Sequence, residues 1–286
     1  MDVWNITRIA DRLEQLDIAI DREAMSVARW IWTEVMELGA DHSHQFIGEE
    51  KEKLDKVFDR LLNGEPIQYI AGHAWFYGMR FSVNPDVLIP RPETEELVEW
   101  ILADAKMNPN KEVRILDIGT GSGCIAIALK KHLGQRAQIF ALDISLGALK
   151  VALKNSVDLK IEIEFIQRDF LQDGLTGMGH FDLIVSNPPY ISKEIAGKDI
   201  IHQLKYEPEA ALFPVGPDPD IFYKKISEWA GDALKEGGCC YMELNEFRAQ
   251  QIEDCFGKDL WDLVEMRIDL QGMPRMLKTV KASSGS

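Results

Sequence analysis

The sequence predicts an α/β protein in which a doubly wound, mostly parallel sheet follows a small N-terminal bundle of helices. Residues 5–62 have apolar side chains at helical spacing and no strand-like alternation. From residue 112 onwards, short continuous apolar runs alternate with helical segments, as in parallel sheets that are buried on both faces. The chain has 286 residues, of which 46% are hydrophobic, so it is long enough to form two domains.

The N-terminal domain is predicted to span residues 1–72. Glycine and proline interrupt its helical pattern at residues 39–48 and 63–66, where we expect breaks between helices. Residues 73–90 form an aromatic and β-branched stretch with a central glycine. Such a stretch predicts a β-hairpin that links the two domains.

The C-terminal domain is predicted to span residues 91–282. Pro90 and Pro92 favour an extended entry into a helix, and glutamates in the first turn of this helix complement its dipole. Residues 283–286 are low in complexity and are predicted to form a disordered tail. The apolar runs predict strands, of which the last two pair antiparallel, at residues 112–118, 138–144, 161–169, 181–187, 239–244, 261–270 and 274–281.

The charge of the chain argues against a surface that binds nucleic acid. The formal net charge is −15. Residues 1–72 carry 8 basic and 15 acidic side chains, which gives 8 − 15 = −7 and leaves −8 for the remainder. Nucleic-acid affinity rests largely on clustered lysine and arginine, and neither part of the chain has an excess of them.

The sequence also indicates a cytoplasmic protein without a membrane segment or a metal site. No uncharged apolar run approaches the roughly 18 residues that cross a bilayer, and the start of the chain lacks the regions of a secretory signal. The cysteines contain no CxxC pair, so we expect neither a disulfide framework nor a zinc site. They are Cys124, Cys239, Cys240 and Cys255.

A glycine-rich loop follows the first strand of the predicted sheet. Gly119, Gly121 and Gly123 allow the backbone to approach a ligand closely where the strand gives way to a helix. Asp143 lies 20 residues after Gly123, at the end of the second strand, and is placed to accept hydrogen bonds from ribose hydroxyls. These features predict a ligand that contains a nucleoside. Together with Ala126, the glycines also fit a dinucleotide fingerprint, so an NAD-linked enzyme stays open.

Further residues around the loop favour a methyl donor. Asp117 precedes the loop, while Asp169 and Phe170 follow the third strand, where they could hold an adenine by a polar contact and a ring face. This series resembles the class I S-adenosylmethionine methyltransferases, which have a Rossmann-like fold. The resemblance implies that the glycine loop passes the methionine part of the cofactor. It also implies that Asp143 binds the ribose and that Asp169 and Phe170 border the adenine.

The fourth strand ends in a rigid corner, Asn187, Pro188, Pro189 and Tyr190, because each proline locks φ. An NH2 group presents two donors, which the Asn187 side-chain oxygen and the Pro188 carbonyl oxygen could accept while Tyr190 supports its flat face. The corner therefore predicts methyl transfer to an amide or aromatic amine nitrogen, a poor nucleophile that the site has to orient. The cofactor sulfonium is already a good leaving group, so no metal is predicted.

Five longer segments resemble the PrmC/HemK family of protein (glutamine-N5) methyltransferases. They are residues 65–100, 115–129, 186–191, 206–212 and 269–277, with "LIPRPET" and "SNPPYI" the most specific. The resemblance implies methylation of the GGQ glutamine in class I peptide chain release factors. It also implies that residues 1–72 form a helical domain that recognises this substrate.

The resemblance assigns site residues by position. The cofactor would be bound by Gly119, Thr120, Gly121, Ser122, Gly123, Asp143, Asp169, Phe170 and Asn187. Asn187, Pro188 and Tyr190 would be catalytic, and with Pro189 they would hold the glutamine. Arg91 and Glu93 would border the site or belong to a rigid linker. One position departs from the family, because Asn245 stands where relatives often have a glycine, which leaves the path of the following loop open.

Three other functions stay open from the sequence. The acceptor could be a glutamine of a ribosomal protein, since the motifs separate such enzymes poorly. It could also be an amino group of a DNA or RNA base, against which the acidic charge argues. The chain could instead be a non-catalytic adaptor that keeps the fold. The expected partners are release factors, with no direct contact to nucleic acid or membrane, and the protein is expected to be a monomer.

Overall fold

The computed structural model divides into two compact units, Met1–Ala74 and Trp75–Ser286. The boundary lies within the stretch for which the sequence predicts a hairpin. Of the predicted tail, only residue 283 is among the residues that the structure describes. The structure describes residues 3–19, 21–39, 43–106, 111–191, 204–257 and 259–283.

The first unit is built of helices. They are α1 (Ile6–Gln15), α2 (Asp21–Trp30), the π-helical turn η1 (Ile31–Val35), α3 (Gly48–Leu62) and α4 (Ile67–Ala71). Asn5 caps α1, since its side-chain oxygen accepts a hydrogen bond from the Arg8 backbone N–H at 2.8 Å. The apolar faces of the helices share one core, in which Trp32 is 1% exposed and donates through Nε1 to the carbonyl oxygen of Gly39 at 2.7 Å.

A short hairpin follows, formed by β1 (His73–Phe76) and β2 (Met79–Ser82). Its two turn residues, Tyr77 and Gly78, both have positive φ, which matches the twist of a tight two-residue turn. The strands end at Ser82, and residues 83–91 lead to the next helix without regular secondary structure.

The second unit contains a seven-stranded sheet in the order β5-β4-β3-β6-β7-β9-β8. The pairs from β5 to β7 are parallel, and β9 pairs antiparallel with both β7 and β8. The sequence prediction of a mostly parallel sheet with antiparallel C-terminal strands is confirmed. The strands are β3 (Val113–Ile118), β4 (Ala137–Asp143), β5 (Glu164–Gln167), β6 (Phe181–Ser186), β7 (Leu234–Glu243), β8 (Trp261–Ile268) and β9 (Pro274–Lys281).

Of these strands, β5 and β7 differ most in length from the prediction. β5 is shorter, because it is an edge strand whose pairing with β4 covers only Phe140 to Asp143. β7 begins earlier, at Leu234, because it pairs with Phe181 on the far side of an irregularity in the ladder between β6 and β7.

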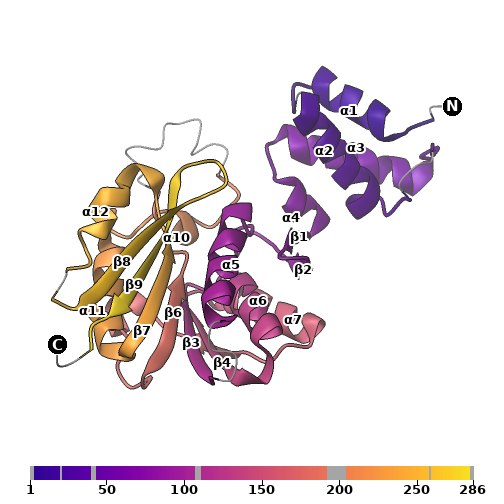
Figure 1. Ribbon diagram of the computed structural model, residues 1–286. Coiled ribbons are helices and arrows are strands. Elements are labelled where there is room, and N and C mark those ends of the chain that lie inside the picture. Colours follow the sequence, from indigo (N-terminus) through magenta and orange to yellow (C-terminus); the bar gives the residue numbers. More distant parts are fainter. Residues whose placement is uncertain are drawn as a thin grey trace. The chain divides into compact units, whose positions relative to one another are not determined.

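Helices cover both faces of the sheet (Figure 1). Alternate side chains of β3 point to opposite faces, so Ile115 packs with α5 (Pro92–Lys106) and α6 (Cys124–Leu133). Leu116 packs in the opposite core with α11 (Ile221–Ala233) and α12 (Ala249–Glu253). The sequence did not predict α11. The remaining helices of the second unit are η2 (Gly134–Arg136), α7 (Leu146–Leu159), α8 (Phe170–Asp173), α10 (Glu209–Leu212) and η3 (Glu246–Arg248).

Several expected absences can be checked only in the part of the chain that the structure describes. There, no helix is long and apolar enough to cross a membrane, and no cluster of three or more histidine, cysteine or carboxylate side chains could hold a metal ion. All four cysteines are free.

Candidate functional site

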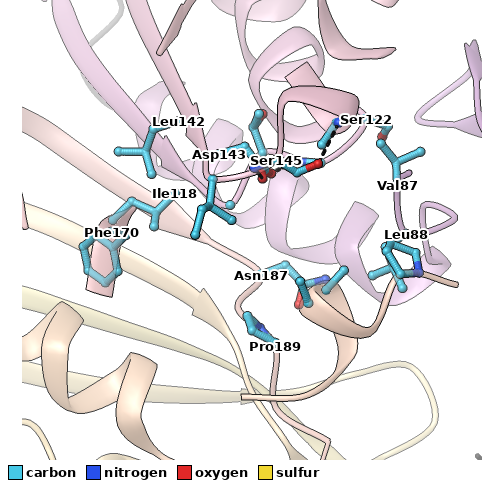
Figure 2. Close-up of a pocket in the computed structure, with 18 of the residues that line it drawn as sticks. Val87, Leu88, Ile118, Ser122, Leu142, Asp143, Ser145, Phe170, Asn187 and Pro189 are labelled. Carbon is cyan, nitrogen blue, oxygen red and sulfur yellow. Dashed lines mark hydrogen bonds between the residues drawn. The ribbon is translucent and has the colours of Figure 1, made fainter. Parts of the chain in front are cut away.

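A pocket of about 260 Å³ lies at the carboxyl ends of β3, β4 and β6, where open α/β sheets bind ligands. In Figure 2, Phe170, Leu142 and Ile118 line one part of the pocket, and Asn187 with Pro189 faces it from another segment. Nine of the residues that the sequence predicts for the site line this pocket. They are Gly119, Thr120, Gly121, Ser122, Asp143, Asp169, Phe170, Asn187 and Pro189.

The backbone of the glycine loop has a conformation that favours glycine. Gly119 and Gly121 have φ values of +73° and +54°, a region that other residues rarely adopt, and a Cβ at either position would meet nothing within 4 Å. Gly123 does not line the pocket. A Cβ on Gly123 would lie 3.2 Å from Ala152 on α7, so this glycine allows α6 and α7 to pack closely.

Asp143 links the loop to the end of β4. One of its carboxylate oxygens accepts from the Gly121 backbone N–H at 2.9 Å, and the other accepts from the Ser145 backbone N–H at 2.9 Å. Burial raises the pKa of Asp143, and these backbone donors act in the opposite direction. A carboxylate offers about four acceptor positions, so two remain for ribose hydroxyls.

Asp117 lies near the end of β3, directly before the loop, and does not line the pocket. It is fully buried, and Thr120 donates its hydroxyl to the Asp117 Oδ2 at 2.7 Å. Burial raises the pKa of Asp117 to about 7. Asp117 therefore anchors the loop through Thr120, which lines the pocket.

Asn155, on α7, was not predicted and secures the other side of the loop. Its side chain donates to the carbonyl oxygens of Ser122 and Ser82 at 2.9 and 3.1 Å and accepts from the Ser82 backbone N–H at 2.7 Å. Asn155 is 2% exposed. It thus ties the glycine loop to the hairpin, a contact between segments too distant in the chain for a sequence pattern to reveal.

Residues that follow β5 line another part of the pocket. Among them, Asp169 caps α8, since its Oδ1 accepts from the Gln172 backbone N–H at 3.2 Å. The ring of Phe170 is 4% exposed and stacks on Phe222, with 6.4 Å between ring centroids and 12° between ring planes. The two aromatic rings form an apolar wall suited to a flat heterocycle. The other unpredicted lining residues include Asp86, Val87, Leu88, Arg168, Gln172 and Val215.

The structure separates the four residues of the NPPY corner. Asn187 and Pro189 line the pocket, whereas Pro188 and Tyr190 do not. Tyr190 donates its hydroxyl to the buried Glu243 at 2.9 Å, and burial raises its pKa. Among the described residues, none donates a hydrogen bond to the carbonyl oxygen of Pro188, a residue that is itself buried.

Arg91 lines the pocket, and Glu93 does not. Arg91 donates to Glu207 at 2.5 Å, and the same carboxylate accepts from the Ile89 backbone N–H at 3.0 Å. Glu93 accepts from the Gln271 side chain at 2.9 Å, in the turn between β8 and β9. Both residues therefore hold neighbouring segments in place, and Arg91 also contributes to the pocket wall.

Asn245 settles the path of the loop after β7. Its φ is −75°, so no glycine is required there. Its side chain donates to the Tyr190 carbonyl oxygen at 3.0 Å and accepts from the Phe247 backbone N–H at 3.0 Å. Asn245 therefore connects this loop to the NPPY corner.

We expect Asn245→Gly to lower thermal stability without abolishing activity. The change removes one cap and one hydrogen bond, worth together about 1 kcal/mol, which corresponds to a fall of about 2–4 °C in Tm. Thermal denaturation checks this value, and Asn245→Ser is the matched control because its hydroxyl oxygen can keep the cap while the donor to Tyr190 is lost. An unchanged Tm with a large loss of activity would contradict a purely supporting role.

Comparisons with known proteins place the chain among methyltransferases. The family described as "Methyltransferase small domain" matches residues 99–217. A protein of Flavobacterium psychrophilum named release factor glutamine methyltransferase is 43% identical over 226 residues, 78% of each chain. A protein of Bacteroides thetaiotaomicron with the same name is 42% identical over 237 residues, 80% of each chain.

A solved structure shows the same fold. It is a methyltransferase from Pyrococcus furiosus, with a TM-score of 0.52 and 20% identity. The similarity covers 80% of this chain and 99% of that chain. At this identity the comparison supports the architecture of the second unit and leaves the substrate undecided.

Proposed function

The chain belongs to the family of release factor glutamine methyltransferases, and from this premise we propose that it methylates the GGQ glutamine of class I peptide chain release factors. The methyl group comes from S-adenosylmethionine and is transferred to the side-chain amide nitrogen. The observation that carries the proposal is the position of Asn187, whose side chain lies at the same pocket as the glycine loop and Asp143.

The residues of the pocket fit this cofactor. The loop at Gly119 and Gly121 presents backbone without side chains, which leaves room for the methionine part. Asp143 has acceptor positions left for the ribose, and Phe170 offers an apolar ring for the adenine. When bound, S-adenosylmethionine would supply the methyl group: the C–S bond of its sulfonium breaks as the N–C bond forms, S-adenosylhomocysteine is left, and the amide nitrogen gives up one proton to solvent.

Asn187 and Pro188 orient the acceptor nitrogen. An amide nitrogen is a poor nucleophile because its lone pair is delocalised, so catalysis depends on holding it in line with the methyl group. The Asn187 side-chain oxygen and the Pro188 carbonyl oxygen would each accept one N–H hydrogen of the glutamine. Both acceptors also stabilise the positive charge that develops on this nitrogen during transfer.

Residues 1–72 would recognise the release factor, with the second unit supplying the chemistry. We further propose that the enzyme acts in the cytoplasm as a monomer and contacts neither nucleic acid nor membrane. The net charge of −15 supports the absence of nucleic-acid contact, because it disfavours the phosphate contacts on which nucleic-acid binding depends.

Initial rates of methyl transfer to different acceptors test this function. The purified protein is incubated with labelled S-adenosylmethionine and, separately, with unmethylated release factor, ribosomal proteins, RNA and DNA. We expect incorporation into release factor alone. Incorporation into ribosomal protein or nucleic acid, with none into release factor, would overturn the proposed substrate.

A further inference from the structure

A chain of hydrogen bonds lies behind the NPPY corner. Asn187 donates through Nδ2 to the Thr94 hydroxyl oxygen at 3.2 Å, and Thr94 donates to the Glu243 Oε2 at 2.6 Å. The Tyr190 hydroxyl donates to the other carboxylate oxygen of Glu243 at 2.9 Å. Thr94 and Glu243 are 2% and 1% exposed, so water does not compete for these bonds.

The chemistry of the groups fixes the direction of the chain. An ionised carboxylate only accepts hydrogen bonds, so the hydroxyls of Thr94 and Tyr190 must both donate to Glu243. Once the Thr94 hydroxyl donates its hydrogen to Glu243, the Thr94 oxygen can only accept a hydrogen bond from Asn187. The Asn187 amide must then turn its NH2 group toward Thr94, which points its oxygen the other way.

The surroundings of Glu243 act on its ionisation in opposite directions, and burial is the larger influence. Burial raises its pKa, whereas Thr94, Tyr190 and the charge of Arg275 on β9 act in the opposite direction. Glu93 on α5 is the nearby group of like charge, and the Tyr223 hydroxyl of α11 donates to the Glu243 backbone carbonyl oxygen at 3.0 Å. Two hydroxyl donors therefore converge on a single buried carboxyl group, while Arg275, which pairs with Glu246 and Asp269, acts on it only through its charge.

The free end of the Asn187 amide lies at the pocket (Figure 2). Within the part of the chain that the structure describes, no group donates to the Asn187 Oδ1. This oxygen is the acceptor that an incoming NH2 group requires. If the amide were flipped, its NH2 group would face the substrate NH2 group, and two donors would oppose each other.

We propose that Thr94, anchored by Glu243, is a positioning residue that keeps the Asn187 amide oxygen facing the acceptor nitrogen. The inference rests on the proposed function and adds to it Thr94, a residue of α5 that lies at the pocket wall and acts through Asn187. It also gives the buried Glu243 a role, because its two carboxyl oxygens accept from Thr94 and Tyr190 and thereby set the direction of the hydrogen-bond chain.

The test compares two substitutions of Thr94. Thr94→Val has the same shape but no hydroxyl, so Asn187 loses the acceptor that orients it. We expect kcat and kcat/KM to fall together by about tenfold or more, with the Kd for S-adenosylmethionine changed by less than about twofold. Thr94→Ser keeps the hydroxyl and should restore most of the rate.

A matched control makes the same change elsewhere in the core. Thr279 on β9 is fully buried, and within the described chain its hydroxyl has no hydrogen-bond partner. Thr279→Val should therefore leave kcat unchanged. Wild-type kcat in Thr94→Val, or an equal loss in Thr94→Ser and Thr94→Val, would overturn the inference.

A second measurement does not depend on the substrate. The side-chain amide of Asn187 gives ¹H–¹⁵N signals, which we expect to be protected from exchange in the wild type and in Thr94→Ser and exposed in Thr94→Val. If the wild type methylates no release factor, the proposed function fails, and these signals still decide the inference. Unchanged Asn187 signals in Thr94→Val would overturn it even in an active enzyme.

Discussion

Asn187→Ala should reduce methyl transfer by about 10²–10³-fold while leaving the affinity for S-adenosylmethionine within about twofold. The side-chain oxygen of Asn187 is one of two acceptors proposed for the glutamine NH2 group, and removal of one such preorganised contact typically costs this much. The cofactor is held mainly by the glycine loop and Asp143, which this change leaves in place.

Single-turnover rates and isothermal titration with the cofactor check this prediction. Gln250→Ala is a suitable control, because Gln250 is an exposed amide side chain on α12 of the second unit, outside the pocket. A loss of cofactor affinity as large as the loss of rate would contradict the assignment of Asn187 to the substrate.

Asp143→Ala should have the reverse effect and weaken cofactor binding by about 10²-fold. The change removes the proposed ribose acceptor and also the partner of the backbone N–H groups of Gly121 and Ser145. Hydrogen bonds to a charged group contribute about 1.5–3 kcal/mol each, and 1.4 kcal/mol corresponds to a factor of ten in Kd. At saturating cofactor, kcat should recover toward the wild-type value.

Titration with S-adenosylmethionine measures this effect directly. Asp158→Ala, at an exposed position on α7, removes a carboxylate of the same type outside the pocket and should leave Kd unchanged. An unaltered Kd in Asp143→Ala would show that the ribose is bound elsewhere.

The fold was largely predictable because its signals are local. Continuous apolar runs mark strands buried on both faces, and the glycines between β3 and α6 mark a loop with positive φ. The lengths of β5 and β7 were less predictable, because they depend on how far a neighbouring strand extends its ladder. α11 was missed although its buried residues Tyr223, Ile226 and Ala230 recur at helical spacing.

The site was predictable only where one short segment carries the chemistry. The glycine loop, Asp143 and the NPPY corner each show a recognisable pattern. Thr94 and Glu243 meet across 149 positions of the chain, and Asn155 meets Ser82 across 73, so no spacing indicates either contact. The placement of Tyr190 also needed the structure, because its hydroxyl donates to Glu243, a residue on another strand.

The central claim is that the NPPY corner directs a methyl group to one glutamine nitrogen of a release factor. Its most direct test is fragmentation mass spectrometry of unmethylated class I release factor after incubation with this protein and S-adenosylmethionine. We predict a single added methyl group on the side-chain nitrogen of the GGQ glutamine, absent with the Asn187→Ala variant. A methyl group on another residue, or no modification despite measured cofactor binding, would contradict the account.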